Sequence, residues 1–271
     1  MATRLRFGSS TEGICESCRV ALEMDLSGRV AVVTGGSRGL GRADALALAA
    51  AGADVALLDV LAADETAGAV EALGRRALAV RCDVGARAEV ERAIEGVRAE
   101  LGAVDILVNN AGALDHLGQL VWQDAELWER DLRVNLTGAL NCARAVWPGM
   151  QERGWGRIVN MSSVVGTLGG FGQASYAATK AGLLGLTKTL ALEGGRYGIT
   201  ANAVVAGIIG TEAFGRLDPA MRERMERRTA LRRVGSPEDV ANAIAFLSSD
   251  LAAYITGAEV NVTGGIELFT F

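Results

Sequence analysis

The sequence contains few histidines, cysteines and prolines, and each shortage argues against a particular kind of site or structure. One histidine, His116, stands among 271 residues, so a metal site with two histidine ligands is impossible and a Ser-His-Asp triad would need that residue. Four cysteines do not form a disulfide framework in a chain of this length, which favours a reducing cytoplasm. Only 3 prolines accompany 35 glycines, so tight turns are expected rather than stiff linkers.

Excess positive charge and long apolar runs are also missing. The net charge is −5, so no global basic field can hold nucleic acid. No run of about 18 apolar residues exists, so no membrane span is expected. With 50% hydrophobic and 22% charged residues, the composition is that of a globular protein. We therefore predict a cytoplasmic protein without a nucleic-acid or membrane partner.

The first 24 residues read as an N-terminal extension. They are polar and lack the apolar centre of a secretory signal, so a mobile tail is expected. Cys15 and Cys18 form a Cys-x-x-Cys pair, but a zinc site would need two further ligands. A metal or redox role for this pair is the less favoured alternative, and no metal site is predicted.

From Arg29 onward, short apolar runs alternate with longer alanine-rich segments. The runs suit buried parallel strands, and segments such as 43–51, 86–101 and 174–197 suit helices. This alternation predicts an α/β fold: one Rossmann-type domain over residues 25–271, with a doubly wound parallel sheet and helices on both faces. The runs are Val30–Thr34, Asp54–Leu58, Ala77–Val80, Asp105–Val108, Arg157–Asn160, Thr200–Val205 and Glu259–Val262. Ser236 and Pro237 predict the start of a further helix that runs to about Leu247.

A glycine-rich turn, Thr34–Gly41, follows the first predicted strand and opens the first helix. Glycines there let the backbone approach a pyrophosphate, whose charge is met by free amides at the helix start. Asp59 ends the second strand, where a carboxylate can accept hydrogen bonds from both adenosine ribose hydroxyls. The alternative is a strand-end aspartate that caps the next turn.

Asp59 also bears on the choice of cofactor. A 2′-phosphate would bring about two negative charges against this carboxylate, and each unit-charge pair at ~4 Å costs roughly 4 kcal/mol at an effective dielectric constant of about 20. Arg38 offsets part of this cost if it points toward the ribose. The sequence predicts NAD rather than NADP.

A tyrosine and a lysine, Tyr176 and Lys180, lie one helical turn apart on the same face of a predicted helix. An ammonium ~4 Å from the phenol is worth about 4 kcal/mol in a partly buried site, enough to bring the tyrosine pKa toward neutrality. Ser163, at the end of a strand, can polarise a carbonyl. The alternative for the pair alone is an ordinary helix face. Asn135, in an apolar helix, must be satisfied by a water or a neighbouring side chain.

These residues together resemble the short-chain dehydrogenase/reductase family over roughly residues 26–265; the resemblance rests on the Thr34–Gly41 turn, Asp83, Asn109–Gly112, Asn135, Ser163, Tyr176 and Lys180. It implies a seven-stranded Rossmann sheet, reversible NAD(P)-linked oxidation of an alcohol, and a homotetramer. Tyr176 would be the general acid/base, and Ser163 would orient the substrate oxygen. Lys180 would bind the nicotinamide ribose, and Asn135 would hold a water in a proton relay. Asp83 would contact the adenine.

The resulting set of cofactor-binding residues comprises Gly35, Ser37, Arg38, Gly39, Leu40, Gly41, Asp59, Asp83, Val84, Asn110, Ala111, Gly112, Tyr176, Lys180, Gly207, Ile209 and Thr211. Two departures from the family pattern stand out. Ala206-Gly207 replaces Pro-Gly after the sixth strand, and Thr263-Gly264-Gly265 replaces Asp-Gly-Gly. Neither removes a reacting group.

Residues 208–234 are a candidate lid over the substrate. The segment is rich in arginine, which suggests an anionic substrate such as an acyl thioester on a phosphate-bearing carrier; the alternative is a solvated helix whose arginines pair with Glu223 and Glu226. A mainly apolar substrate body is expected from candidate lining residues Leu114, Val164, Val165, Phe171, Ile208 and Ile209. His116 is expected in a surface loop rather than on the substrate.

The leading hypothesis is an NAD-dependent oxidoreductase that interconverts a secondary alcohol and a ketone. An NADPH-linked 3-oxoacyl thioester reductase is the alternative among enzymes: Arg38 favours it and Asp59 opposes it. A non-catalytic dinucleotide-binding regulatory protein is the alternative of another class.

Overall fold

The computed structural model describes residues 24–114 and 117–268. The predicted N-terminal extension, with Cys15 and Cys18, lies outside these residues except for Met24, and so does His116. Seven parallel strands form one sheet in the order β3-β2-β1-β4-β5-β6-β7. This confirms the predicted α/β fold. The strands are β1 (Val30–Thr34), β2 (Asp54–Asp59), β3 (Ala77–Arg81), β4 (Ile106–Asn109), β5 (Gly156–Ser163), β6 (Ile199–Ala206) and β7 (Glu259–Val262).

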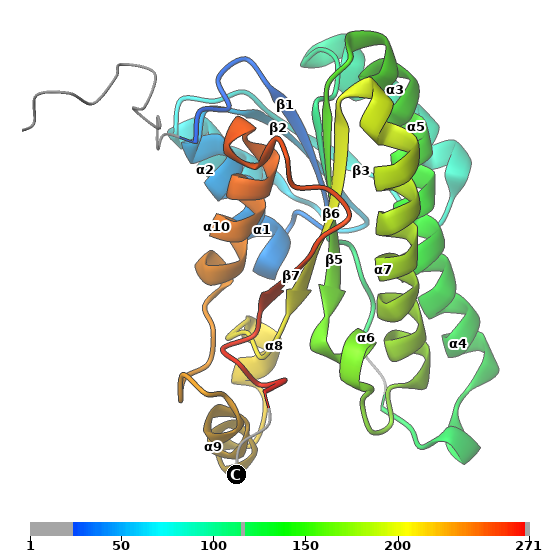
Figure 1. Cartoon of the computed structure of the whole chain (residues 1–271), viewed down its shortest axis with the longest axis vertical. Helices are drawn as coiled ribbons and strands as arrows, with labels where there is room; N and C mark the ends of the chain where they lie inside the picture. The colour runs from blue at the N-terminus through cyan, green and yellow to red at the C-terminus, as the bar shows by residue number, and fades with distance from the viewer. Residues whose placement is uncertain (1–23, 115–116, 269–271) are drawn as a thin grey trace, which may run out of the picture.

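Helices cover both faces of the sheet (Figure 1). One face carries α1 (Gly39–Ala50), α2 (Asp64–Ala72) and α10 (Pro237–Ser248). The other carries α3 (Arg87–Glu100), α5 (Gly138–Arg153) and α7 (Ala174–Gly194), while α4 (Ala125–Asp131) leads into α5 through the π-helix η3 (Leu132–Thr137). The shorter elements are η2 (Leu120–Trp122), α6 (Val164–Leu168), η4 (Gly195–Tyr197), α8 (Glu212–Gly215), α9 (Pro219–Arg228) and η5 (Asp250–Ala252).

Two apolar cores flank the sheet because successive strand residues point to opposite faces. In β1, Ala31 and Val33 belong to the core under α1 and α10, and Val30 and Val32 belong to the core under α3 and α5. The central strands β1 and β4 are therefore buried along their whole length, as expected of a parallel sheet covered on both sides, whereas the edge strands β3 and β7 are partly exposed.

The helix predicted at Ser236 is present as α10. Ser236 Oγ accepts a hydrogen bond from the Asp239 amide at 3.3 Å, and the Asp239 carboxylate accepts one from the Ser236 amide at 2.8 Å. This reciprocal capping box satisfies two amides of the helix start. The helix ends at Ser248, one residue beyond the expected end. Strand β5 ends at Ser163, as expected, and so extends beyond the apolar run Arg157–Asn160, because pairing with β6 continues to Ala206.

The carboxyl ends of all seven strands lie at one edge of the sheet, with α6, α8 and α9 beside it (Figure 1). The strand order reverses between β1 and β4, which in open α/β sheets creates the crevice where ligands bind. Within residues 24–114 and 117–268, no helix combines the length and apolarity that a membrane crossing needs. Across that same part of the chain, no group of three or more His, Cys, Asp or Glu side chains is arranged to hold a metal ion.

Candidate active site

The glycine-rich turn has the geometry that a pyrophosphate needs. Gly35 and Gly39 adopt φ values of +67° and +57°, in the left-handed region that favours glycine. A side chain at Gly41 would collide with the Gly35 carbonyl oxygen. Arg38 stands at the N-cap of α1 with extended backbone and makes no side-chain cap. The first amides of α1 therefore stay available to an anion at the positive end of the helix dipole.

Asp59 and Ser37 lie side by side at the end of β2 and in the glycine-rich turn, and a ribose contact there stays a prediction. The Asp59 carboxylate accepts hydrogen bonds from the amides of Ser37 and Leu61, both at 3.0 Å. The local turn-capping role considered from the sequence is thus real, but two amide bonds do not exhaust a carboxylate that can accept about four. Ser37 Oγ is buried without a protein partner. A buried hydroxyl of this kind requires a partner, and a bound dinucleotide would supply one.

Thr34 joins the glycine-rich turn to the end of β4. Its hydroxyl accepts hydrogen bonds from the amides of Asn110 and Ala111 at 3.0 Å and donates to the Val108 carbonyl at 3.3 Å. The Asn110 side chain returns the link by donating to the carbonyls of Thr34 and Gly35 at 2.9 and 3.2 Å. These bonds fix the backbone that would lie beneath the nucleotide. The sequence marked Thr34 only as the start of the turn.

Asp83, the predicted adenine contact, is held by a residue that sequence reasoning missed. Arg133 Nη1 donates to Asp83 Oδ2 at 2.6 Å, and the Gly85 amide donates to Oδ1 at 2.9 Å. Burial raises the pKa of Asp83, but these two bonds outweigh it and hold that pKa below its ordinary value. Val84 is fixed beside it, because Asn141 Nδ2 donates to its carbonyl at 3.0 Å. No sequence motif joins Arg133 to Asp83, which lies fifty positions earlier.

Asn135 lies in the π-helix η3 rather than in a regular α-helix, and its side chain is 1% exposed. Its Oδ1 accepts from the Ala113 amide at 2.6 Å, and its Nδ2 donates to the Ala113 carbonyl at 3.0 Å and to Thr179 Oγ1 at 3.3 Å. The buried Asn135 amide therefore has the hydrogen-bond partners that it was expected to need, and most of them are backbone groups. Asn135 thereby fixes the loop after β4, and its predicted water-holding role stays a prediction.

The structure brings the three candidate catalytic side chains together. Ser163 ends β5 and caps α6, where its hydroxyl accepts from the Val165 amide at 3.2 Å, and it lies close enough to Tyr176 to influence the pKa of the phenol. Lys180, one turn after Tyr176 on α7, is 3% exposed. Its ammonium lies 5.4 Å from the centre of the Tyr176 ring and donates to the Met161 carbonyl at 2.7 Å.

The direction of the Tyr176 shift differs from the sequence argument. Burial raises the pKa of Tyr176, and the nearby Ser163 hydroxyl opposes this only in part. Burial also lowers the pKa of Lys180 to about 8. The predicted lowering of the tyrosine pKa is therefore wrong for the nucleotide-free protein. The reason is that the ammonium is turned to the Met161 carbonyl while the phenol is removed from water.

Beyond β6, Gly207 meets a close backbone approach: a Cβ there would lie 2.6 Å from Thr263 Cα. The replacement of the family's Pro-Gly by Ala206-Gly207 therefore keeps the glycine that this close approach requires. Ile209 follows, 9% exposed and bridged to Gly235, and Thr211 precedes α8. The nicotinamide contacts assigned to these three residues stay predictions.

The candidate lid, 208–234, contains α8 and α9. Arg227 pairs with Glu223, and Arg233 pairs with Asp239 at 2.6 Å. Local pairing, the alternative to an anion site, thus accounts for these two arginines.

Among the candidate pocket-lining residues, Val164 packs against the small buried cluster of Leu184, Ala203 and Val205. Phe171, in contrast, is 87% exposed. The apolar residues near Ser163 therefore fall into two groups, one that packs against the core and one that is exposed to solvent.

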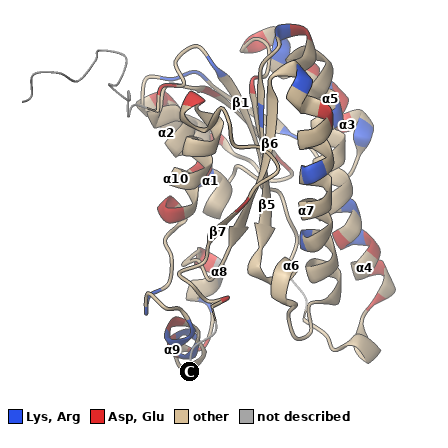
Figure 2. Cartoon of the chain, in the orientation of Figure 1, with Lys and Arg blue, Asp and Glu red and all other residues tan. Residues whose placement is uncertain are grey.

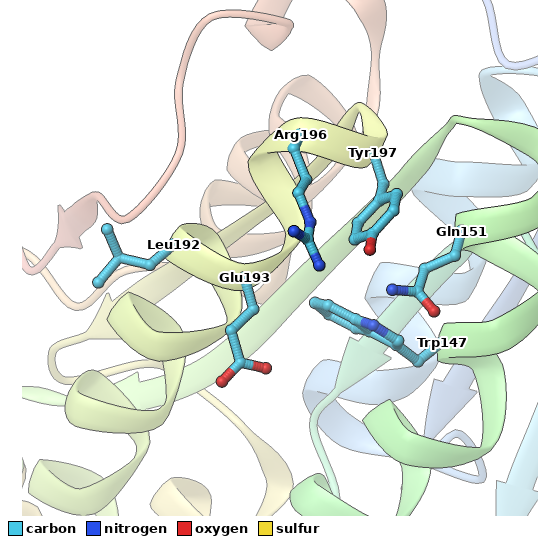
Figure 3. Close-up of a pocket in the computed structure, with 6 residues that line it drawn as sticks. All are labelled: Trp147, Gln151, Leu192, Glu193, Arg196 and Tyr197. Atoms are coloured by element: carbon cyan, nitrogen blue, oxygen red, sulfur yellow. The ribbon is translucent and has the colours of Figure 1, made fainter.

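Two surface cavities lie away from Tyr176. One of 390 Å³ opens between α5 and α7 and is lined by Trp147, Gln151, Leu192, Glu193, Arg196 and Tyr197 (Figure 3). The other, of 840 Å³, lies along α4 and η3 between Ala125 and Thr137. Both are on the outer helical face rather than at the carboxyl edge of the sheet.

Comparison with known proteins matches most of this chain to one family. Residues 35–267 match a family described as enoyl-(acyl carrier protein) reductase. A 3-oxoacyl-[acyl-carrier-protein] reductase from Escherichia coli K12 is 42% identical over 90% of this chain and 99% of its own. An acetoacetyl-CoA reductase from Rhizobium meliloti 1021 is 44% identical over 88% of this chain and 98% of its own. A crystal structure described as a short-chain alcohol dehydrogenase from Sinorhizobium meliloti 1021 superposes with a TM-score of 0.86 at 38% identity, over 90% of this chain and 98% of that one.

The chain belongs to the short-chain dehydrogenase/reductase family. It is an oxidoreductase that acts on a carbonyl or hydroxyl group, and its family binds a nicotinamide dinucleotide.

Proposed function

We propose that this protein is an NADH-dependent reductase of 3-oxoacyl thioesters. The arrangement that carries the proposal is the approach of Ser163, at the end of β5, to Tyr176 on α7, with the Lys180 ammonium 5.4 Å from the centre of the phenol ring. The similarity to a 3-oxoacyl carrier-protein reductase and an acetoacetyl-CoA reductase favours the thioester, which was the alternative from sequence. The product is a secondary alcohol, so the reaction type expected from sequence is retained.

When held by the glycine-rich turn and Asp59, NADH would supply the hydride that reduces the ketone carbon. Ser163 Oγ donates a hydrogen bond to the ketone oxygen and polarises it. Tyr176 donates its phenolic proton to the same oxygen as negative charge develops there. Burial keeps the pKa of Tyr176 above its usual value, so the proton is present at neutral pH for the reductive direction. Lys180 holds its positive charge behind the phenol and stabilises the phenolate that proton transfer leaves.

Asp59 supports NADH over NADPH. Its carboxylate is fixed by two amides at the end of β2, where a 2′-phosphate would meet it. The buried Ser37 hydroxyl and the crowded glycine turn fit the remainder of a dinucleotide. The proposal therefore keeps the cofactor predicted from the sequence while adopting the substrate class that the relatives favour.

The test is a spectrophotometric assay of acetoacetyl-CoA reduction with NADH and with NADPH. Tyr176→Phe should abolish turnover, at least about a thousandfold, because the proton donor is removed. Binding of NADH, measured by calorimetry, should stay within a few fold because the phenyl ring remains.

Three other results would redirect the assignment. Turnover of simple secondary alcohols with NAD, but of no thioester, would return it to a general alcohol dehydrogenase. NADH binding without turnover of any alcohol or ketone would indicate a regulatory dinucleotide-binding protein. A clear preference for NADPH would reject the cofactor part alone.

We also propose that the protein self-associates, as the family resemblance implies, through the outer face of α5 and α7. Leu192 is 85% exposed there, beside the groove between Trp147 and Tyr197 (Figure 3). The groove places Leu192 together with Trp147 and Tyr197, and aromatic side chains are enriched in interfaces. Sedimentation should show a tetramer that Leu192→Glu dissociates, while Leu73→Glu, at an exposed leucine directly after α2, should leave it intact.

The lid over residues 208–234, the single domain over 25–271 and the cytoplasmic location stay predictions. The position of α8 and α9 beside the carboxyl ends of the strands supports the lid (Figure 1). Limited proteolysis of this segment should slow when NADH is added if the lid closes on the bound nucleotide.

A further inference from the structure

Two loops beside the catalytic edge expose an unusual number of large apolar side chains. Six of them are more than half exposed, and together we call them the apolar rim. They are Leu117 (73%), Leu120 (79%), Val121 (78%), Trp122 (79%), Leu168 (59%) and Phe171 (87%). Single exposed apolar residues are common on protein surfaces, but a contiguous group marks a binding surface.

The two loops form one surface. The Gly118 amide donates a hydrogen bond to the Gly172 carbonyl at 2.9 Å, and a Cβ at Gly172 would lie 3.4 Å from the Gly118 nitrogen. Neither 117–123 nor 164–173 contains a charged residue, although 22% of the chain is charged. Figure 2 shows α6 free of charge, while α9, near the same edge of the sheet, carries both signs. The rim is therefore suited to an uncharged, apolar ligand.

The apolar rim begins at the active site. Ser163 caps the start of α6, and Leu168 is the last residue of that helix. A five-residue helix is ~8 Å long at 1.5 Å per residue, so the rim starts about that far from the polarising hydroxyl. Val164 and Val165, both partly buried, follow Ser163 directly, and no charged residue lies between the hydroxyl and the rim. A molecule that reacts at Ser163 can thus extend along α6 onto the rim without meeting a charge.

We propose that the apolar rim binds the alkyl chain of the substrate and makes the enzyme selective for 3-oxoacyl thioesters with medium or long chains. This inference rests on the proposed function. An alkyl chain would cover side chains that are otherwise in water and would leave water itself. A membrane surface is the weaker occupant, because neither loop carries the lysine or arginine that would attract anionic lipid, and Asp124 and Glu126 follow directly.

The test compares 3-oxobutanoyl-, 3-oxooctanoyl- and 3-oxododecanoyl-CoA. For a half-buried chain, kcat/KM should rise roughly twofold per methylene, or about fifteenfold from the four-carbon to the eight-carbon substrate. The double variant Leu120→Ser/Trp122→Ser should lose most of this rise and keep the four-carbon activity. The matched control Leu73→Ser/Tyr254→Ser removes one exposed leucine and one exposed aromatic residue elsewhere and should keep the rise. Circular dichroism should show all variants folded, because every substituted side chain is exposed.

The possible failures are distinguishable. Turnover of acetoacetyl-CoA with no gain from chain length, or a gain that survives in the Leu120/Trp122 variant, overturns the rim while the proposed function stands. Turnover of no 3-oxoacyl-CoA of any length overturns the proposed function and the rim with it. Co-sedimentation with phosphatidylcholine vesicles, or a change of oligomeric state in the Leu120/Trp122 variant, would instead assign the rim to a membrane or to a second copy of the chain, and would also overturn the proposal.

Discussion

Replacing Asp59 with asparagine should shift the cofactor preference from NAD toward NADP. The carboxylate is held at the end of β2 by the amides of Ser37 and Leu61, so it cannot easily turn away from a 2′-phosphate. Asparagine keeps the size of the side chain and one acceptor oxygen but removes the charge. The substitution therefore tests charge more than shape.

The magnitude follows from the distance and the exposure. A unit-charge pair at ~4 Å costs about 4 kcal/mol at an effective dielectric constant of 20, and screening at this partly exposed site halves the cost to about 2 kcal/mol. Asp59→Asn should therefore raise kcat/KM for NADPH roughly thirtyfold. The value for NADH should fall about fivefold, because a neutral amide binds the ribose hydroxyls about 1 kcal/mol less tightly than a carboxylate.

The assay is the initial rate of acetoacetyl-CoA reduction with each cofactor at fixed ionic strength. Asp64→Asn, which removes another carboxylate close in sequence at the start of α2, is the control for general charge loss. A change in the NADPH/NADH ratio of less than threefold, or an equal change in the control, would show that Asp59 does not set the preference. Preference of the unaltered enzyme for NADPH would refute the reasoning outright.

The remaining predictions concern Lys180, Arg133 and Ser236. Burial lowers the pKa of Lys180 from 10.5 to about 8, so reductive kcat/KM should fall above about pH 8. The free energy of unfolding should rise between pH 8 and pH 10.5, because the folded protein loses its proton at Lys180 before the unfolded chain does. Urea titrations of the enzyme at several pH values would check the sign, and Lys180→Met should lack the rise. Arg133→Met should raise KM for NADH about fivefold with kcat nearly unchanged, since it releases only Asp83; equal effects on kcat would contradict a positioning role. Ser236→Ala should lower the free energy of unfolding by about 1 kcal/mol, and an unchanged denaturation midpoint would show that the capping box contributes nothing.

Local sequence signals predicted the elements on which the candidate site stands. The Thr34–Gly41 turn works through backbone freedom within a few residues, and the spacing of Tyr176 and Lys180 works through one helical turn. Both are short-range geometry, so the sequence alone was sufficient. The length of β5 was less well predicted from its apolar run, because the length of a strand is set by the partner strand with which it pairs.

Contacts between distant parts of the chain escaped prediction. Arg133, in η3, meets Asp83 only through the folding of segments fifty positions apart, and the π-helix that carries Asn135 was predicted as an ordinary helix. The exposure of Leu120, Trp122 and Phe171 was equally hidden, because apolar residues in a sequence are expected to be buried.

The amino-acid order alone determined that this chain forms a parallel sheet wrapped by helices, with a phosphate-binding turn and a tyrosine next to a lysine. Periodicity and turn chemistry depend on neighbours along the chain, so they can be read from it. The three-dimensional arrangement decided the ionisation of that pair. Burial is the sum of contacts from strands and helices far apart in the chain, and here it raises the pKa of Tyr176 and lowers that of Lys180.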